Sequence, residues 1–285
     1  RDLRMSRGLG DVYKRQGGTA VAALKYWVWL TALPGLSNRS RLLLLERYGS
    51  PEDVYYADPD ELAQVEGLTP GQAALLADKS LSRADRILAD CARGDMFLLT
   101  MQDAAYPARL RDIFDPPVLL YGKGSLPLFD EEAAIAVVGT RSCTPYGLRC
   151  AHRMGYELAR QGAVVVSGMA KGIDGAAMRG ALQAGGFTAA VLGGGVDVVY
   201  PAENRRLYED IAATGVLLSE YPPGTEPLPG HFPVRNRIIS GLSLAALVVE
   251  APVRSGALIT AHAALDQGRD VFAVPGPIDA AASVG

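Results

Sequence analysis

The chain has 285 residues, a length that suits one large α/β domain with a smaller partner domain. Hydrophobic residues make up 49% of it and charged residues 21%, which excludes global disorder. The net charge of −3 argues against a protein that binds nucleic acid with its whole surface, so a polyanionic partner would need a local basic patch. No apolar run reaches the ~18 residues that span a bilayer. Three cysteines without a secretory signal favour the reducing cytoplasm.

Residues 1–22 differ in character from the rest of the chain. They carry five basic and two acidic side chains and show no helical or strand periodicity. A basic arm for nucleic acid is one interpretation. We favour the other, a non-native or disordered extension. At the opposite end, the sequence up to Gly285 lacks a closing element, and we expect the natural protein to continue beyond it.

Residues 23–93 are predicted to form a small all-α domain, because apolar residues recur there with helical spacing. Two segments in this region, 33–37 and 65–69, each place a glycine between apolar residues just before a helix. Similar turns occur in helix-hairpin-helix repeats, where turn amides can meet a DNA phosphate. A purely structural helical bundle is the alternative, and it is the one we favour.

From residue 94 onward, strands are predicted to alternate with helices. The predicted strands are 96–100, 118–121, 135–138, 163–166, 188–192, 216–219, 244–249 and 270–274. The predicted helices are 146–160, 173–184, 204–213, 236–242 and 258–267. Continuous apolar strands between helices predict an extended Rossmann-like α/β domain over residues 94–285, with a doubly wound, mostly parallel sheet covered on both faces. Ligands of such sheets bind beyond the carboxyl ends of the strands.

Those strand ends carry small and basic residues. The first strand of the alternating region runs into Gly139-Thr140-Arg141, where a guanidinium beside helix amides would suit a phosphate. The next ends at Ser167-Gly168 and is followed by Lys171. Neither turn matches the dinucleotide fingerprint G-x-G-x-x-G, and no G-x-x-x-x-G-K-[ST] loop occurs, which argues against nicotinamide and P-loop chemistry. Several such turns at one sheet edge predict a groove for a polyanion.

The segment Arg235-Asn236-Arg237 adds two more cations. Residues two apart lie on opposite sides of a helix, so both arginines cannot face one ligand if the segment is helical. We expect at least one of them to contact the ligand. The alternative for the other is an internal pair with Glu220 or Glu250.

The search for catalytic groups is mostly negative. The three histidines lack metal-ligand spacing. Cys143 stands near Arg141 at a helix start, which could lower the pKa of its thiol, but the sequence offers it no clear partner base. Asp174 and Asp197 are expected to cap loops. We therefore predict no catalytic residue, no metal and no cofactor.

Six ordered motifs resemble the DNA-processing protein DprA (Smf) family over residues 24–285. They are VVGTR at 137–141, SGMAKGID at 167–174, YPAEN at 200–204, LSEYP at 218–222, FPVRNRIISG at 232–241 and RSGALITA at 254–261. The resemblance implies a protein that binds single-stranded DNA, forms a homodimer and helps to load the RecA recombinase on incoming DNA during natural transformation. It also implies a sterile-alpha-motif-like or helix-hairpin-helix-like head. Members often carry a basic residue after the Tyr-Pro, where this chain has Ala202.

The strand-end pattern and this resemblance together predict a set of DNA-binding residues. The set comprises Gly139, Thr140, Arg141, Ser167, Gly168, Lys171, Gly195, Asn204, Arg205, Arg235, Asn236, Arg237, Ser255 and Gly256.

Two other functions remain open at this point. One is a nucleotide-handling enzyme of the lysine-decarboxylase-like Rossmann class, whose P-G-G-x-G-T-x-x-E segment would correspond to the helix start at 255–260. This chain has no glutamate there before Asp266, so the general acid/base is missing. The other is a sensor that binds a nucleotide without chemistry.

Overall fold

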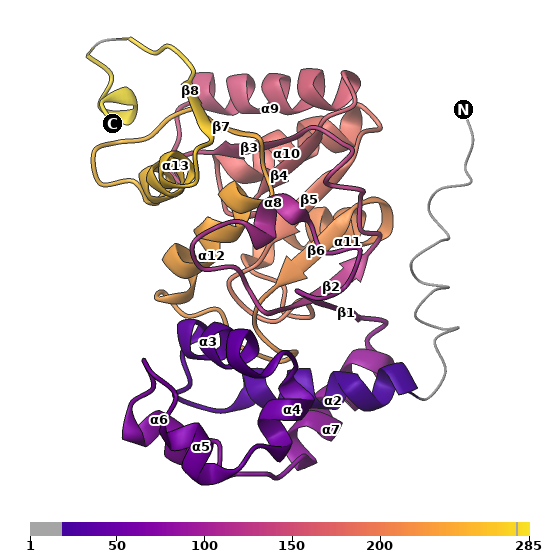
Figure 1. Cartoon of the computed structure of the whole chain (residues 1–285). Helices are drawn as coiled ribbons and strands as arrows, with labels where there is room; N and C mark the ends of the chain where they lie inside the picture. Colours follow the sequence, from indigo (N-terminus) through magenta and orange to yellow (C-terminus); the bar gives the residue numbers. More distant parts are fainter. Residues whose placement is uncertain (1–18, 278) are drawn as a thin grey trace. The chain divides into compact units, whose positions relative to one another are not determined.

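The computed structural model describes residues 19–277 and 279–285 (Figure 1). Residues 1–18, most of the expected extension, lie outside that part. The chain divides into two compact units. One runs to Gln102 and includes Pro117–Leu120, and the other comprises Asp103–Pro116 and Tyr121–Gly285. The domain boundaries expected from the sequence stay predictions, and strand β1, which they group with the sheet domain, falls in the first unit.

The first unit is a helical bundle, as its apolar periodicity predicts. Its elements are α2 (Thr19–Ala32), α3 (Asn38–Tyr48), α4 (Pro51–Tyr56), α5 (Pro59–Ala63), α6 (Pro70–Leu75), α7 (Ser82–Arg93) and β1 (Phe97–Thr100). Val28, Leu30, Leu44 and Leu76 are fully buried in it. The bundle therefore has an apolar core of its own.

The two glycine segments of this unit form the same kind of turn. Gly35 and Gly67 adopt φ angles of +87° and +89°, which favour glycine over residues with a side chain. Each turn is followed by a capped helix: Ser37 caps α3, and Thr69 caps α6 with a capping box. The predicted glycine turns are thus present, and their binding to phosphate stays a prediction.

The second unit is built on a doubly wound sheet, which confirms the predicted fold class. Its strands are β2 (Leu119–Gly124, of which the first two residues belong to the first unit), β3 (Ala134–Val138), β4 (Val164–Ser167), β5 (Thr188–Val191), β6 (Val216–Ser219), β7 (Ala245–Val248) and β8 (Asp270–Ala273). They lie in the order β2-β6-β5-β4-β3-β7-β8. β2 pairs with β6 in antiparallel fashion, and the other pairs are parallel. The chain runs outward from β3 in both directions, so ligand sites are expected at the carboxyl ends beside β3.

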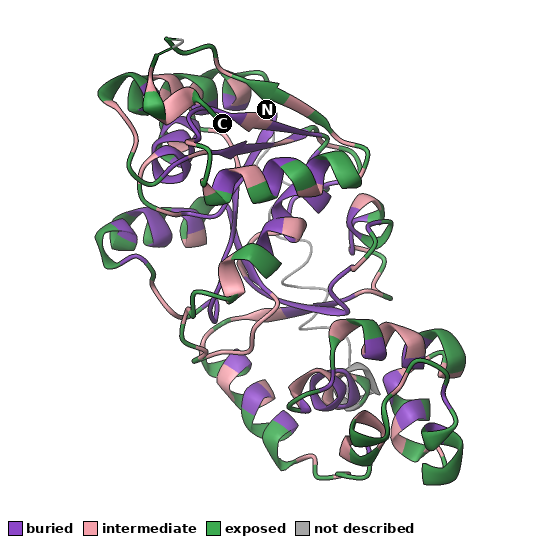
Figure 2. Cartoon of the chain, turned by 90° about the vertical axis from the view of Figure 1, so that its left-hand side faces the viewer, coloured by how far each residue is buried: buried purple, intermediate pink, exposed green. Residues whose placement is uncertain are grey.

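Helices cover both faces of this sheet. They are α8 (Ala108–Arg111), α9 (Pro145–Arg160), α10 (Ile173–Gln183), α11 (Arg205–Thr214), α12 (His231–Gly241) and α13 (Gly256–Asp266), with single turns η1 (Ala202–Asn204) and η2 (Ala281–Ser283). α10 packs between α9 and α11, whereas α12 packs against α8 and α13. The strands are buried between these layers (Figure 2). α12 begins five residues before the predicted helix. No helix in the described part is long and apolar enough to cross a membrane.

Helices α9 and α10 approach each other backbone to backbone. Gly155 of α9 lies against the carbonyl oxygen of Ala177, and Gly180 of α10 lies against that of His152. A Cβ atom at either glycine would overlap that oxygen. The buried cluster under this crossing consists mostly of small side chains such as Ala151, which lets the two helices pack closely.

We expect Gly155→Ala to destabilise the protein by roughly 3 kcal/mol, because the new methyl group would push the two helices apart. In an exposed helix interior, alanine normally stabilises a protein by about 1 kcal/mol relative to glycine. A loss of stability in Gly155→Ala would therefore indicate the close contact between α9 and α10. Urea unfolding measures the difference. Gly71→Ala in α6 is the matched control, because its Cβ would meet only the Thr69 hydroxyl, at 4.0 Å. Equal stability changes in the two variants would contradict the close packing of α9 and α10.

Candidate nucleic-acid interface

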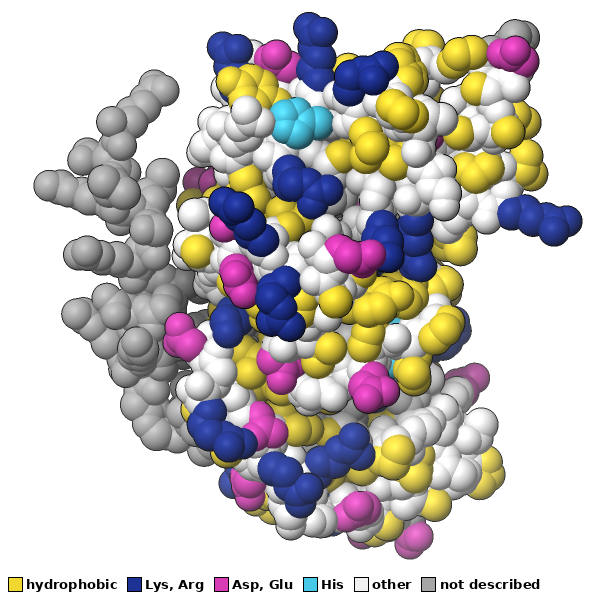
Figure 3. All heavy atoms as spheres, turned by 180° about the vertical axis from the view of Figure 1, so that it is seen from behind, with side chains coloured by type: hydrophobic (Ala, Val, Ile, Leu, Met, Phe, Trp, Pro, Cys, Tyr) yellow, Lys and Arg dark blue, Asp and Glu magenta, His cyan; other side chains and the backbone are white. Residues whose placement is uncertain are grey.

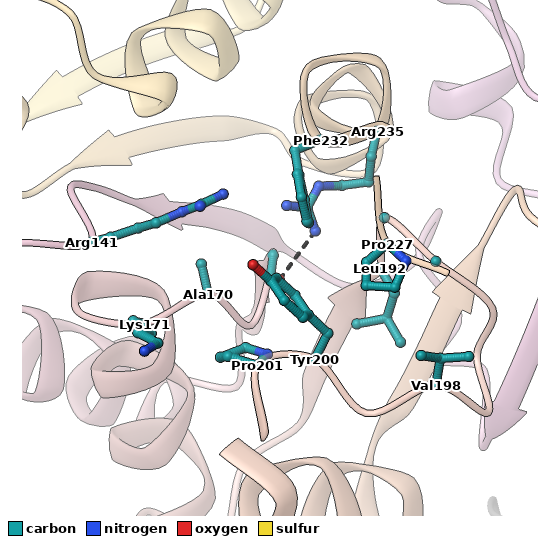
Figure 4. A pocket seen from close by; sticks show the side chains of 13 residues that line it. Arg141, Ala170, Lys171, Leu192, Val198, Tyr200, Pro201, Pro227, Phe232 and Arg235 are labelled. Carbon is teal, nitrogen blue, oxygen red and sulfur yellow. Dashed lines mark hydrogen bonds between the residues drawn. The ribbon is translucent and has the colours of Figure 1, made fainter. Parts of the chain in front are cut away.

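Two adjoining cavities open at the carboxyl ends of the strands. The first, which we call the aromatic cavity, has a volume of about 280 Å³ and is lined by Arg141, Lys171, Leu192, Tyr200, Phe232 and Arg235 among others (Figure 4). The second, the polar cavity, has about 480 Å³ and is lined by Thr140, Asp174, Asn236, Arg254, Ser255 and Thr260 among others. Arg141, Tyr200, Phe232 and Arg235 line both. The two cavities therefore form one continuous groove.

Arg141 follows β3 and carries an exposed guanidinium. The centre of that group lies 5.1 Å from the centroid of the Phe232 ring, a cation–π distance. Just beyond Arg141, a carboxylate already accepts the hydrogen bonds that the start of α9 offers. Thr144 donates its backbone N–H to Glu250 Oε2 at 2.8 Å and its hydroxyl to Oε1 at 2.6 Å. A phosphate bound jointly by Arg141 and the first amides of α9 was expected, but Glu250 occupies that position. Arg141 instead points toward the aromatic cavity.

The loop after β4 is fixed by buried side chains. Gly168 and Ala170 donate their N–H groups to Asp174 Oδ2 at 3.2 and 3.4 Å. Asn204 donates its amide N–H to the carbonyl of Met169 at 2.9 Å. Burial raises the pKa of Asp174, and the charge of Arg235 opposes that rise. Asp174 is thus the loop cap that we predicted.

Asn204 does not reach either cavity. Its carboxamide is buried and engaged on both sides, because its Oδ1 accepts a bond from Arg179 at 3.2 Å. We predict Asn204 as a DNA contact from the sequence. In the structure its hydrogen bonds instead hold the loop that carries Lys171. Lys171 lies at the rim of the aromatic cavity and pairs with Glu203, both side chains being more than half exposed. Arg205 is exposed at the start of α11, outside both cavities.

Arg235 is buried beneath the groove. Its guanidinium donates to the carbonyl oxygens of Gly168, at 3.1 Å, and of Val191, and its Nε donates to Asn236 Oδ1 at 3.1 Å. Burial lowers the pKa of Arg235 to about 10, against the opposing effect of Asp174, so the group stays charged at neutral pH. It offers the groove a fixed positive charge.

Arg237 points away from the groove. Its guanidinium contacts Asp115 Oδ2 at 3.0 Å and Glu220 Oε1 at 2.8 Å. Burial lowers the pKa of Arg237, but these two carboxylates more than offset that effect, so the pKa is raised. The helix places the two arginines on opposite sides, as the spacing predicts, and Arg237 is the one with the internal pair. Asn236 between them donates to the carbonyl of Gly256 at 3.3 Å and thereby joins α12 to α13.

Aromatic rings form walls that the predicted set omits. The rings of Tyr200 and Phe232 lie with centroids 5.5 Å apart and planes tilted by 32°. Tyr200 is 43% exposed although it stands in the groove. Both residues lie inside the quoted motifs YPAEN and FPVRNRIISG. Exposed aromatic residues beside cations are a pattern typical of nucleic-acid binding, and they could have been chosen on that ground.

Other predicted residues support the groove from below or behind. Gly195 does not line either cavity. It packs closely against Gly224 and Pro222, and a Cβ atom there would come within 2.9 Å of their backbone atoms. Asp197 accepts the N–H of Gly224 at 2.9 Å and is the predicted loop cap. The buried hydroxyl of Ser167 donates to a strand carbonyl at 2.7 Å.

Four further residues of the predicted set do line the polar cavity, namely Gly139, Thr140, Ser255 and Gly256.

Cys143 does not have the activated thiol that a helix start could provide. Burial raises the pKa of this cysteine, which is opposite to the effect that a helix start could have had. Among residues 19–277 and 279–285, no three His, Cys, Asp or Glu side chains gather as a metal site would require.

One face of the molecule carries side chains of mixed charge. On the face shown in Figure 3, basic side chains are interspersed with acidic ones. The net charge of −3 is consistent with this mixture. Arg141, Arg235 and Arg254 line the polar cavity and bring positive charge to the groove.

Comparison with known proteins places these features in a family. Residues 97–285 match the family model described as DNA recombination-mediator protein A. The DNA processing protein DprA of Bacillus subtilis is 44% identical over 193 residues, which cover 68% of this chain and 65% of that protein. The protein of the same name from Streptococcus pneumoniae is 50% identical over 176 residues, 62% of each chain. The chain thus spans less than two thirds of the length of these curated relatives.

Two solved structures are similar as well. The X-ray structure of DprA from Streptococcus pneumoniae matches with a TM-score of 0.80 at 39% identity and covers 90% of this chain and 89% of that one. A structure of DNA processing protein A from Helicobacter pylori, described by its single-stranded DNA binding mode, matches with a TM-score of 0.59 at 32% identity. It covers 64% of this chain and 82% of its own.

We expect Arg237→Ala to lower the free energy of unfolding by about 3 kcal/mol, because it removes the cation that pairs with the largely buried carboxylate of Glu220. Chemical denaturation measures this loss. Arg141→Ala, which removes an exposed guanidinium, is expected to change stability by less than about 0.5 kcal/mol. Equal stability of the two variants would contradict the structural role assigned to Arg237.

Proposed function

The chain belongs to the DNA recombination-mediator protein A family, whose members are also named DprA or Smf, and from that premise we propose that it binds single-stranded DNA in the groove formed by the two cavities. The observation that carries the proposal is the arrangement of Tyr200 and Phe232 beside the guanidinium groups of Arg141 and Arg235.

Aromatic walls suit an unpaired base. A base stacks on an aromatic ring with about 1–3 kcal/mol and little regard to sequence, because every base has a π-face. Phe232 lies under two guanidinium groups, 5.1 Å from that of Arg141 and 5.8 Å from that of Arg235. A base in a duplex would have to leave its stack to enter the aromatic cavity, so the geometry favours a single strand.

The cations of the groove suit the backbone of that strand. Arg141 is exposed, has no ion pair in the described residues and lines both cavities. Arg235 adds a fixed charge, and Lys171 stands at the rim, where its pair with Glu203 is exposed and therefore weak. A phosphate that reaches the rim can displace such a pair at little cost.

A homodimer of the sheet-bearing unit is part of the proposal. It rests on the family resemblance and on exposed apolar side chains of one region. Ile259 and Leu265 on α13 are 44% and 58% exposed, and Phe272 on β8, which ends the strand order of the sheet, is 57% exposed. Apolar residues exposed beside a strand edge favour pairing with a second copy.

The wider role follows from the family alone. We propose that the protein acts in the cytoplasm, protects incoming single-stranded DNA and helps to load RecA on it during natural transformation. We also propose that it does so without catalysis. Release of free base from nucleoside monophosphates, lost on mutation of the groove, would contradict the last point.

We expect Arg141→Ala to weaken binding of labelled oligothymidylate roughly ten- to hundred-fold, because a charge-assisted contact contributes about 1.5–3 kcal/mol. Wild-type affinity should fall steeply with salt as phosphate contacts release counterions, and the slope of the variant should be smaller by about 0.7. Fluorescence anisotropy at several salt concentrations measures both.

Arg153→Ala is the matched control, since Arg153 is exposed on α9 and lies outside both cavities. A duplex of the same length tests strand preference. If the Arg141 variant binds like the Arg153 variant, the groove is wrongly assigned. Salt-independent binding by the wild type would contradict phosphate recognition itself.

We expect the wild type to be a dimer in light scattering at micromolar concentration and Leu265→Glu to be monomeric, because the new carboxylate would be buried without a partner. Leu148→Glu on α9, where Leu148 is 40% exposed, is the control and should leave the dimer intact. A monomeric wild type would contradict the proposed dimer. A dimeric Leu265→Glu variant would show that the α13 and β8 face is not its interface.

A further inference from the structure

Helix α12 carries Phe232, one wall of the aromatic cavity, in its first turn. The cap position before the helix holds Gly230, which has no side chain to accept an N–H of the first turn. Helix ends fray unless their first turn is held by other contacts. The place of the Phe232 ring therefore depends on contacts that its neighbours make.

His231, the residue beside Phe232, supplies such a contact. Its ring nitrogen Nδ1 lies 2.9 Å from the carbonyl oxygen of Gly193, in the loop after β5. A carbonyl oxygen only accepts hydrogen bonds, so Nδ1 carries the proton and donates it. The Phe232 ring lies against the same glycine, where a Cβ atom would come within 2.8 Å of it. Two consecutive side chains of α12 thus hold Gly193, one at its carbonyl and the other at its Cα.

Tyr221 supports the imidazole of His231. The two rings are stacked, with centroids 4.0 Å apart and planes 17° from parallel. The backbone N–H of Tyr221 donates to the hydroxyl of Ser219 at 3.0 Å, and that hydroxyl donates to the carbonyl oxygen of Gly194 at 2.7 Å. Burial raises the pKa of Tyr221 to about 12, so this ring is uncharged at neutral pH. The support of His231 is therefore tied to the glycine loop as well.

The His231 and Tyr221 rings stand behind the wall of the groove. Neither residue lines the aromatic or the polar cavity, whereas Phe232, Gly193 and Gly194 line the aromatic cavity. The stacked pair can therefore act on a bound strand only through Phe232 and the glycine loop. This arrangement is that of a positioning pair and not of a contact to the ligand.

We propose that His231 is a positioning residue, which with Tyr221 beside it fixes the Phe232 ring where a base in the aromatic cavity stacks on it. The inference rests on the proposed function and separates base contacts from phosphate contacts within it. Arg141 acts on phosphates, whereas His231 acts on the stacking of the base. Loss of His231 therefore removes the contribution of the base and leaves phosphate recognition intact.

The test separates these two contributions with matched probes. One is a labelled oligothymidylate, and the other is an oligonucleotide of the same length and phosphate number whose sugars carry no bases. We expect the wild type to prefer the oligothymidylate roughly tenfold, as for one stacked base. His231→Leu should reduce this preference to less than about threefold, because Phe232 is no longer held in place. Its affinity for the abasic probe and its salt slope should equal those of the wild type.

Conservative variants and a control complete the comparison. His231→Asn keeps an N–H donor near the place of Nδ1 and should restore part of the preference, and Tyr221→Phe keeps the stacked ring and should retain all of it. Tyr221→Leu removes that ring and should lose the preference. His152→Leu is the matched control, because His152 lies on α9 outside both cavities. Arg141→Ala should weaken the binding of both probes.

Thermal unfolding shows which variants are folded at the temperature of the binding measurement. A preserved tenfold preference in His231→Leu, or equal losses of affinity for both probes, would overturn the positioning role. If His231→Leu is unfolded, Tyr221→Leu and Tyr221→Phe decide in the same way. A wild type that binds both probes equally would also overturn it, because Phe232 then stacks no base, while the groove still binds phosphates. If the wild type binds neither probe, the proposed function itself is overturned.

Discussion

A buried guanidinium must find acceptors or it destabilises the fold, and this requirement organises the groove of this protein. Arg235 meets it by donating to the carbonyl oxygens of Gly168 and Val191, at the ends of two neighbouring strands. Gly168 has to lack a side chain, because a Cβ there would come within 2.5 Å of that guanidinium. Asp174, whose charge offsets the effect of burial on the pKa of Arg235, also holds the loop after β4. One charge thus ties together two strands, a loop and helix α12.

The shape of the groove depends on close approach between backbone segments. Gly193 lies against the ring of Phe232, and Gly194 against the carbonyl of Thr225, at distances that leave no room for a Cβ. The same requirement brings α9 and α10 together at Gly155. Gly193 and Gly194 also line the aromatic cavity. They set how deeply Phe232 sits between the loops and hence the width of the aromatic cavity.

The arginines and lysine of the motifs divide by whether an acid lies within reach. Arg237 is neutralised by Glu220 and Asp115, and Lys171 is paired at the surface with Glu203. Arg141 and Arg254 have no ion pair among the described residues, and both border the polar cavity. An acidic chain can therefore present a local positive site, because its carboxylates are placed beside particular cations and away from others. Glu250 makes the point most clearly, since it occupies the helix start that a phosphate could otherwise take.

Periodicity and composition were enough to predict the alternating strands and helices, because buried parallel strands need continuous apolar runs and each is followed by a helix. The order of the motifs was enough to identify the family. The spacing of Arg235 and Arg237 also determined that they must point apart on a helix. Sequence could not decide which of the two faces the groove, because Asp115 lies more than a hundred residues away and meets Arg237 only after folding. Nor could it show that Asn204 holds a loop, that Glu250 holds Thr144, the cap of α9, or that Tyr200 and Phe232 form one wall. Each of these contacts joins residues distant in the chain, and only the tertiary structure brings such partners within bonding distance.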